Sequence, residues 1–201
     1  MSLIPEFELG LWNAWIFVLP FLLVCLGLSR LIVRVFFTSN KKPAGYGRPH
    51  NPSGLFNKQE KKLVYISMVI TFALYIYSIF LPIKLGTTWL YIGFFVYLVG
   101  AIFGTVAQIN YDTTPVDKPI TKGVYHISRN PMYFGQFLLF ISIGIACISW
   151  LYLLLTASNI ILDTMLVTAE ERWCLEKYGE AYREYKNKTP KWIGIPKSKK
   201  K

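Results

Sequence analysis

The sequence predicts an all-α protein that spans a membrane as a polytopic helical bundle, because it is apolar, poor in charge and divided into long uncharged stretches. Of its 201 residues, 53% are hydrophobic and 16% are charged, whereas soluble chains carry roughly a quarter charged residues. About 20 apolar residues cross a bilayer as a helix. Residues 1–201 therefore form one predicted membrane domain. The stretches without Lys, Arg, Asp or Glu are 9–29, 63–83, 85–111 and 130–162.

The fourth uncharged stretch is too long for one crossing. Between Met132 and Leu162 a single helix would measure roughly 46 Å at 1.5 Å per residue, which exceeds the hydrocarbon core of about 30 Å. A tight helical hairpin that turns near 147–150 accommodates the same residues in two crossings. The two helices can extend into the headgroups and the cytoplasm to complete their length.

The distribution of basic residues supports this hairpin. With it, three charged regions share one side of the membrane: 30–62, 112–129 and the tail after Asp163. They hold 8, 3 and 10 of the 22 Lys and Arg residues, and only Lys84 lies opposite. Cytoplasmic segments carry such an excess. The sequence thus predicts about five transmembrane helices and a cytoplasmic C-terminal helix, with the N-terminus outside and the C-terminus and active site in the cytoplasm.

The net charge of +11 and the cysteines exclude several other classes of protein. Because the basic residues flank apolar stretches, anionic membrane lipids are the expected counter-charge, and no nucleic-acid partner is expected. Cys25, Cys147 and Cys174 are scattered and form no CxxC or His/Cys spacing. We therefore predict neither a disulfide nor a metal site.

Two patterns concern the bundle itself. The linker 38–62 is rich in Pro and Gly and is predicted to be mostly irregular. Gly100 and Gly104 form a GxxxG pair inside the third predicted helix. Such pairs allow two helix backbones to approach closely, so we expect a helix contact here.

The segment 121–135 contains a predicted helix start that faces the cytoplasm. Asn130 is a favoured N-cap and Pro131 suits the first helical position. The free N–H groups of such a start attract carboxylates and phosphates, and the planar fork of Arg129 suits a carboxylate. The alternative interpretation is a capped helix with a snorkelling arginine at the membrane border.

After Asp163 the chain becomes charged but keeps its helical periodicity. Glu170 and Glu171 lie where the last crossing leaves the lipid, and their carboxylates can accept hydrogen bonds from a ribose diol or pair with an ammonium group. The alternative is a solvated face on which Glu171 lies near Arg172 and Lys177. Gly179 is expected to end or kink this helix. A zwitterionic cofactor that carries a sugar would fit between the two regions.

The C-terminal half resembles the isoprenylcysteine carboxyl methyltransferase and phospholipid methyltransferase group of integral membrane methyltransferases. The shared signature is Gly-x-Tyr, then Arg-His-Pro-x-Tyr-x-Gly at a helix start, then Glu-Glu, then Phe-Gly-x-x-Tyr-x-x-Tyr before a Pro. Here these stand as Gly123-Val-Tyr125, Arg129-Asn-Pro-Met-Tyr-Phe-Gly135, Glu170-Glu171 and Tyr178-Gly-Glu-Ala-Tyr-Arg-Glu-Tyr185 with Pro190.

The resemblance implies a methyltransferase that uses S-adenosylmethionine and acts at the membrane on a lipophilic or prenylated acceptor, with residues 112–190 as the cofactor-binding core. No catalytic residue is identified; for an amine acceptor, Glu171 and Tyr133 are the candidate bases. Asn110 is an alternative to Gln108 in the cofactor site. That predicted site, from the matched motifs and the helix start, comprises Gln108, Ile120, Tyr125, Arg129, Asn130, Pro131, Met132, Tyr133, Glu170 and Glu171.

Departures from the signature leave the acceptor open between a carboxylate, an amine and a thiol. The motif histidine is Asn130, as in phospholipid methyltransferases, and Asp117 and Leu166 stand near where prenylcysteine enzymes carry a histidine and an arginine. Two other classes of function remain. The segment from Glu171 to Gly179 resembles the tail of NADPH-dependent sterol reductases, and a non-catalytic membrane scaffold would keep the same fold.

Overall fold

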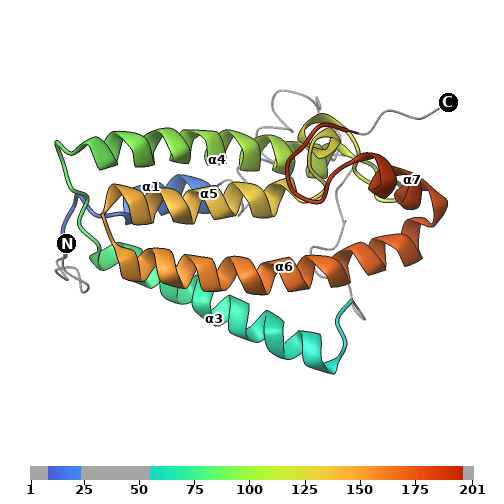
Figure 1. Ribbon diagram of the computed structural model, residues 1–201, viewed down its shortest axis with the longest axis horizontal. Helices are drawn as coiled ribbons and strands as arrows, with labels where there is room; N and C mark the ends of the chain where they lie inside the picture. Colours follow the sequence, from blue (N-terminus) through green and yellow to red (C-terminus); the bar gives the residue numbers. More distant parts are fainter. Residues whose placement is uncertain (1–8, 24–54, 197–201) are drawn as a thin grey trace, which may run out of the picture.

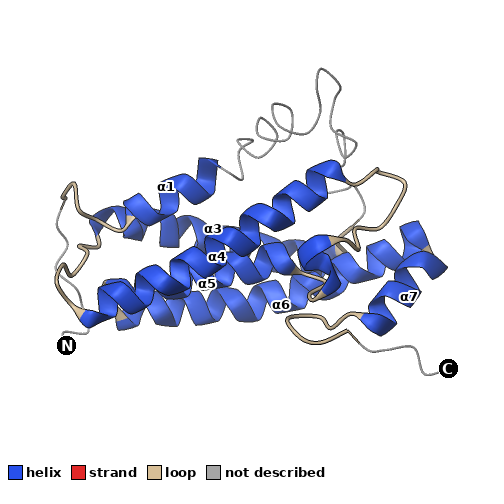
Figure 2. Ribbon diagram, turned by 90° about the horizontal axis from the view of Figure 1, so that it is seen from above, coloured by secondary structure: helices blue, strands red, loops and turns tan. Residues whose placement is uncertain are grey.

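The computed structural model describes residues 9–23 and 55–196, and the regular structure of these residues is entirely helical (Figures 1 and 2). The helices are α1 (Trp15–Leu23), α3 (Lys58–Phe80), α4 (Thr88–Thr113), the short 3₁₀ helix η2 (Gly123–His126), α5 (Pro131–Ala146), α6 (Trp150–Tyr178) and α7 (Glu180–Lys188).

Three of these helices are long and apolar enough to cross a membrane. The helices α3, α4 and α6 have 23, 26 and 29 residues, and α5 is a shorter apolar helix. The predicted class, an all-α membrane bundle, is confirmed. The first predicted crossing, 9–29, is described only up to Leu23. Cys25, most of the linker 38–62 and the tail from residue 197 also lie outside the described residues. The total of five crossings therefore stays a prediction.

The predicted hairpin is present between α5 and α6. Only residues 147–149 separate the two helices, which run antiparallel (Figure 1). The Ser149 N–H donates to the Gly144 carbonyl at 2.9 Å, and the Ser149 hydroxyl accepts from the N–H of Tyr152 at the start of α6. We call the end of the bundle that holds this turn the turn end, and the opposite end, which carries α7, the tail end.

The start of α1 also lies at the turn end. The Ala14 N–H donates to the Leu81 carbonyl at 3.0 Å, and the Asn13 amide donates to the Ile79 carbonyl at 2.7 Å, which ties α1 to the end of α3. The start of α3, the 114–130 loop and the tail are consequently at the tail end. This matches the predicted sharing of one side by these regions, whereas their cytoplasmic orientation stays a prediction.

One boundary was predicted wrongly. The irregular linker was expected to extend to Lys62, but α3 already begins at Lys58. The reason is a capping box: the Asn57 side chain accepts from the N–H of Glu60 at 2.8 Å, and the Glu60 carboxylate accepts from the N–H of Asn57 at 2.8 Å. This reciprocal pair satisfies free donors at the helix start, so the helix can extend past the apolar stretch into charged sequence.

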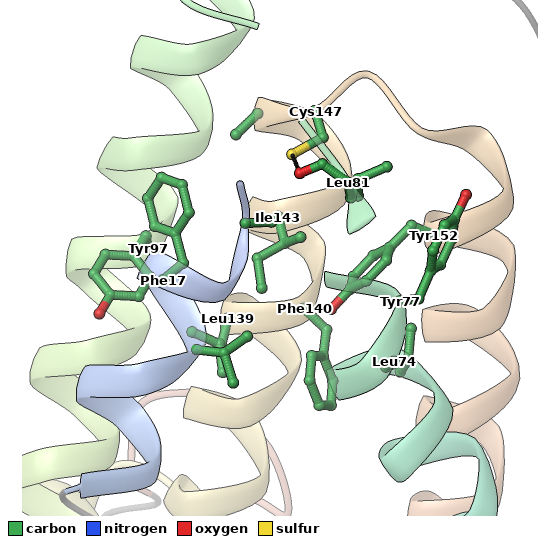
Figure 3. Close-up of a cluster of buried hydrophobic side chains, with 13 residues drawn as sticks. Phe17, Leu74, Tyr77, Leu81, Tyr97, Leu139, Phe140, Ile143, Cys147 and Tyr152 are labelled. Atoms are coloured by element: carbon green, nitrogen blue, oxygen red, sulfur yellow. Dashed lines mark hydrogen bonds between the residues drawn. The ribbon is translucent and has the colours of Figure 1, made fainter. Parts of the chain in front are cut away.

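The main buried cluster lies toward the turn end and draws on residues of α1, α3, α4, α5 and α6 (Figure 3). Phe17 of α1 meets Tyr97 of α4 edge to face, with ring centroids 5.0 Å apart. Tyr152 of α6 contacts both Phe140 of α5 and Tyr77 of α3. Because apolar packing concentrates at this end, the tail end is free to hold polar groups.

Small residues bring α4 and α5 into close contact, as the GxxxG pair predicts. A Cβ placed on Gly100 would lie 2.8 Å from the Leu138 Cβ and 3.0 Å from the Gly135 carbonyl oxygen. A Cβ on Gly135 would likewise lie 2.9 Å from the Gly104 backbone. The contact fixes the start of α5 against α4, and this start carries the motif residues of the site.

We expect Gly100→Ala to destabilise the protein by about 1–3 kcal/mol, because the added methyl group has no room between the two helices. Thermal unfolding in detergent would measure the loss. Gly104→Ala is the matched control: its Cβ would meet only Phe21, at 3.4 Å, and alanine favours the helix by up to about 1 kcal/mol. Equal losses in the two variants would contradict a contact centred on Gly100.

Candidate functional site

A cavity of about 160 Å³ lies at the tail end, among the 114–130 loop, the start of α5, the end of α6 and α7. We call it the tail-end cavity. Eight of the ten predicted site residues line it: Ile120, Tyr125, Arg129, Asn130, Met132, Tyr133, Glu170 and Glu171. The fold thus gathers residues that are up to 51 positions apart in the sequence around one space.

Two predicted site residues lie behind the cavity wall. Gln108 is 3% exposed and donates from Nε2 to Asp112 Oδ2 at 3.3 Å within α4. Pro131 is buried as the first residue of α5, as predicted. The alternative to Gln108, Asn110, packs against Gly123, where a Cβ would lie 2.3 Å from Asn110 Nδ2. Gly123 also has a φ of +60°, so both space and backbone explain the glycine in the Gly-x-Tyr motif.

The start of α5 is covered by the tail. Asn130 occupies the N-cap position, but its side chain makes no capping bond. Its Nδ2 instead donates to the Lys191 carbonyl at 3.1 Å, and the Arg129 N–H donates to the Pro190 carbonyl at 3.0 Å. The expected capping bond, in which Asn130 Oδ1 would accept from a first-turn N–H, is not made, because the side-chain amide is directed at the tail that folds back across this helix start.

Arg129 binds a carboxylate through its fork, and that carboxylate belongs to Glu171. Nε and Nη2 donate to the two oxygens of Glu171 at 2.9 and 3.3 Å. Nη1 donates to the carbonyls of Lys186 and Thr189, both at 2.7 Å. The side chains of Arg129 and Glu171 are only 10% and 6% exposed. The arginine therefore joins α5, α6 and the tail from a buried position.

The alternative in which the paired acids form a solvated face is wrong. Glu171 is 4% exposed, and its second cationic partner is Lys186 of α7, at 3.1 Å from Oε2. Arg172 instead reaches back to Glu60 at the start of α3, with contacts of 2.8 and 2.9 Å. Lys177 lies over the Trp173 ring, 4.6 Å from its centroid.

Glu170 has a different environment from its neighbour. Its Oε1 accepts from the Tyr133 hydroxyl at 2.6 Å. No donor from the described part of the chain contacts its Oε2, and no cation there pairs with it. The adjacent glutamates thus differ in their partners. Glu171 pairs with two cations, whereas the Glu170 carboxylate lines the cavity and can accept further hydrogen bonds.

Sequence reasoning assigned Tyr125 and Tyr133 to this cavity but not its other aromatic residues. Gly179, with a φ of +55°, ends α6 as predicted and lets α7 fold back. This places Tyr182 and Tyr185 in the wall, and Tyr185 donates to the Tyr125 carbonyl at 2.6 Å. Burial raises the pKa of the Tyr185 phenol, so it remains a donor. The other unassigned lining residues are Leu55, Tyr111, Pro119, Trp173, Cys174 and Tyr178.

The fold and the two motif regions define the class of integral membrane methyltransferases, and the family can be stated directly. Residues 66–181, more than half of the chain, match the family model described as phospholipid methyltransferase. The chain belongs to this family. The matched segment runs from within α3 to the beginning of α7 and includes the lining residues of the tail-end cavity except Leu55, Tyr182 and Tyr185. Searches of curated proteins and of solved structures found no match.

We expect Arg129→Ala to destabilise the protein by about 3–5 kcal/mol, because it leaves the buried Glu171 carboxylate without its bidentate partner. Chemical or thermal unfolding in detergent would measure this. Arg172→Ala removes an equally well-formed pair with Glu60 at an exposed position, where the arginine side chain is 48% exposed, and should cost much less. Similar losses would show that the Arg129 pair does not organise the site.

Proposed function

We propose that the protein is an S-adenosylmethionine-dependent methyltransferase that binds the cofactor in the tail-end cavity and methylates a membrane lipid. The family match supports a methyltransferase. The observation that carries the proposal is that the motif residues converge on one cavity at the end of a membrane bundle, where a water-soluble cofactor and a lipid can both arrive. Such an arrangement holds two substrates of opposite polarity together.

The residues of the cavity fit the chemistry of this cofactor. Trp173, Tyr178 and Tyr182 offer apolar and aromatic surface for an adenine ring. The Glu170 carboxylate suits a cationic or hydroxyl-bearing group, because its Oε2 has no donor in the described chain. Arg129 contributes by holding Glu171 and the tail in place, since its guanidinium already binds four oxygen atoms of the protein.

S-adenosylmethionine, when bound, supplies a methyl group on a positively charged sulfur, from which an acceptor removes it by in-line attack. The chain's own part is to orient the two reactants and exclude water. The folded-back tail and the partly buried Tyr133–Glu170 pair, which lines the cavity, serve this purpose. For an amine acceptor, Glu170 is a better candidate base than Glu171, which is neutralised by Arg129 and Lys186.

A phospholipid amine is the favoured acceptor over an isoprenylcysteine carboxylate. The family description favours it. A carboxylate acceptor needs a cationic partner, but Arg129 is the only cationic residue in the described cavity wall and is already paired with Glu171. The same reasoning disfavours the NADPH-dependent reductase, because its cofactor phosphate also needs free basic groups. A non-catalytic scaffold does not require a cavity lined by aromatic residues and an available carboxylate, so the tail-end cavity disfavours this alternative.

The purified protein should bind S-adenosylmethionine and its demethylated product, and should not bind NADPH. Ligand that binds only the folded state stabilises it by about 2.7 kcal/mol at 100 times Kd, so the melting temperature should rise with either sulfur compound. A rise with NADPH and none with S-adenosylmethionine would reverse the choice between methyltransferase and reductase.

Cys174 reports whether the cofactor sits in this cavity. Cys174 lines the wall and is partly exposed, whereas Cys147 is 2% exposed in the core. Saturating S-adenosylmethionine should protect Cys174 from alkylation, as followed by peptide mass spectrometry, while Cys147 should stay unmodified throughout. Unchanged alkylation of Cys174 in the presence of bound cofactor would place the cofactor elsewhere.

Methyl transfer should label a phospholipid and not a prenylated cysteine. The protein, reconstituted into vesicles of phosphatidylcholine and phosphatidylethanolamine, would be supplied with S-adenosylmethionine carrying a labelled methyl group, with N-acetyl-farnesylcysteine present as the competing acceptor. We expect the label in the phosphatidylethanolamine fraction. Label confined to a base-labile ester of the farnesylcysteine would identify the carboxylate reaction instead.

A further inference from the structure

A second cavity, of about 460 Å³, lies between α3 and α6 and touches α5. We call it the wedge cavity, because α3 and α6 lie close together near the turn end and diverge toward the tail end (Figure 1). Toward the divergent end, the Arg172–Glu60 pair bridges the two helices through long side chains. The space between the helices is therefore built into the packing of two membrane-spanning elements.

The rim of the wedge cavity opens on the outer surface of the bundle. Met68 and Phe72 of α3 line it and are 58% and 65% exposed. Both belong to a helix that is apolar enough to cross a membrane, so their exposed surface faces lipid. A lipid molecule can thus reach the cavity sideways from the bilayer without passing through water.

The interior of the wedge cavity is polar, in contrast with its rim. Asp163 is 3% exposed; its carboxylate accepts from the Ser67 hydroxyl at 2.6 Å and from the Asn159 amide at 3.0 Å. Thr71 donates to Asn159 Oδ1 at 3.2 Å. A carboxyl group this deep in a membrane-spanning helix is costly, and such groups commonly mark functional sites.

The wedge cavity and the tail-end cavity share a wall. Tyr133 and Glu170 line both. Glu170 is also seven residues after Asp163, two turns along the same face of α6. The charged residues in the wall of the wedge cavity are therefore these two acids, one deep in the bundle and one at the junction with the proposed cofactor site.

We propose that the wedge cavity is the acceptor site and that it selects a lipid with an amine headgroup, with Asp163 as the residue that determines this specificity. The inference rests on the proposed function. Two carboxylates favour an ammonium group, and the aromatic faces of Phe72, Tyr75 and Tyr133 add cation–π attraction. The acyl chains remain at the apolar rim formed by Met68 and Phe72.

The geometry also assigns a path for the proton. Glu170 takes one proton from the ammonium group, which leaves a nitrogen lone pair directed at the tail-end cavity. This lone pair attacks the methyl carbon; the N–C bond forms, the C–S bond breaks, and its electron pair stays on sulfur, which becomes a neutral thioether. The proton on Glu170 then passes to water in the tail-end cavity. Tyr133 holds the carboxyl group through its hydroxyl throughout.

The test uses full-length protein in phosphatidylcholine vesicles with increasing fractions of phosphatidylethanolamine. Asp163→Asn should raise the apparent KM for phosphatidylethanolamine at least tenfold, with less than a twofold change in the Kd for S-adenosylmethionine. Ser78→Ala is the control, because it removes a buried hydrogen bond of α3, from the Ser78 hydroxyl to the Tyr75 carbonyl at 2.6 Å, at a position that does not line the wedge cavity, and it should keep the wild-type KM. If Asp163→Asn lowers only the melting temperature, or if both variants change KM equally, the carboxylate is structural and the assignment is wrong.

A second pair of variants tests the cavity itself. Val64→Trp places a large ring in the wedge cavity, whereas Val69→Trp makes the same change on α3 at a position that is 50% exposed and does not line it. Val64→Trp should lose at least tenfold in methyl transfer while it retains cofactor binding, and Val69→Trp should behave as wild type. Normal transfer by Val64→Trp would overturn the assignment. Wild-type protein that neither binds S-adenosylmethionine nor labels any lipid would instead overturn the proposed function.

Discussion

The buried ion pair between Arg129 and Glu171 is the interaction on which the tail end depends. Each partner comes from a different helix, and the arginine also donates to two carbonyls at the end of α7 and just beyond it. Burying either charge alone is unfavourable by several kcal/mol. The folded state therefore requires the start of α5, the end of α6 and the tail to meet at this point, and the tail-end cavity is the space that this meeting encloses.

Two adjacent glutamates acquire different roles through helix geometry. Successive residues in an α-helix point about 100° apart, so Glu171 faces the tail and Glu170 faces Tyr133. The first carboxylate is neutralised by Arg129 and Lys186. The second keeps an oxygen without a donor from the described chain and borders both cavities. A single Glu-Glu pair thus supplies one group that holds the tail and one that remains available to the cavities.

The two glutamates acquire these environments because the turn end and the tail end of the bundle are packed differently. Aromatic and aliphatic side chains fill the turn end (Figure 3), and close glycine contacts fix α5 against α4. On the other side of α5, the helices α3 and α6 are held by polar contacts such as Ser67 to Asp163 and by the exposed Arg172–Glu60 pair. Dense packing on the α4 side of α5 and open packing between α3 and α6 leave the wedge cavity beside the start of α5.

The sequence by itself determined the elements of this protein and much of its site. Uncharged stretches predicted the membrane helices, and the surplus length of 130–162 predicted the hairpin. These features could be predicted because they depend on local hydrophobicity, length and spacing. The start of α3, which was placed too late, also had a sequence signal in the Asn57–Glu60 capping pair. The motif residues near Arg129 and Glu170 could be assigned to one site because they stand in the order of a known family signature.

Only the tertiary structure decided how those residues are used. The partner of Arg129, the separate environments of Glu170 and Glu171, and the inclusion of Leu55 and Tyr182 in the wall all depend on which helix faces which. The path of the tail across α5, which replaces the expected Asn130 cap, depends on a contact between residues about 60 positions apart. Hydrophobic periodicity carries no information about such polar contacts, because they are set by the three-dimensional meeting of helix ends.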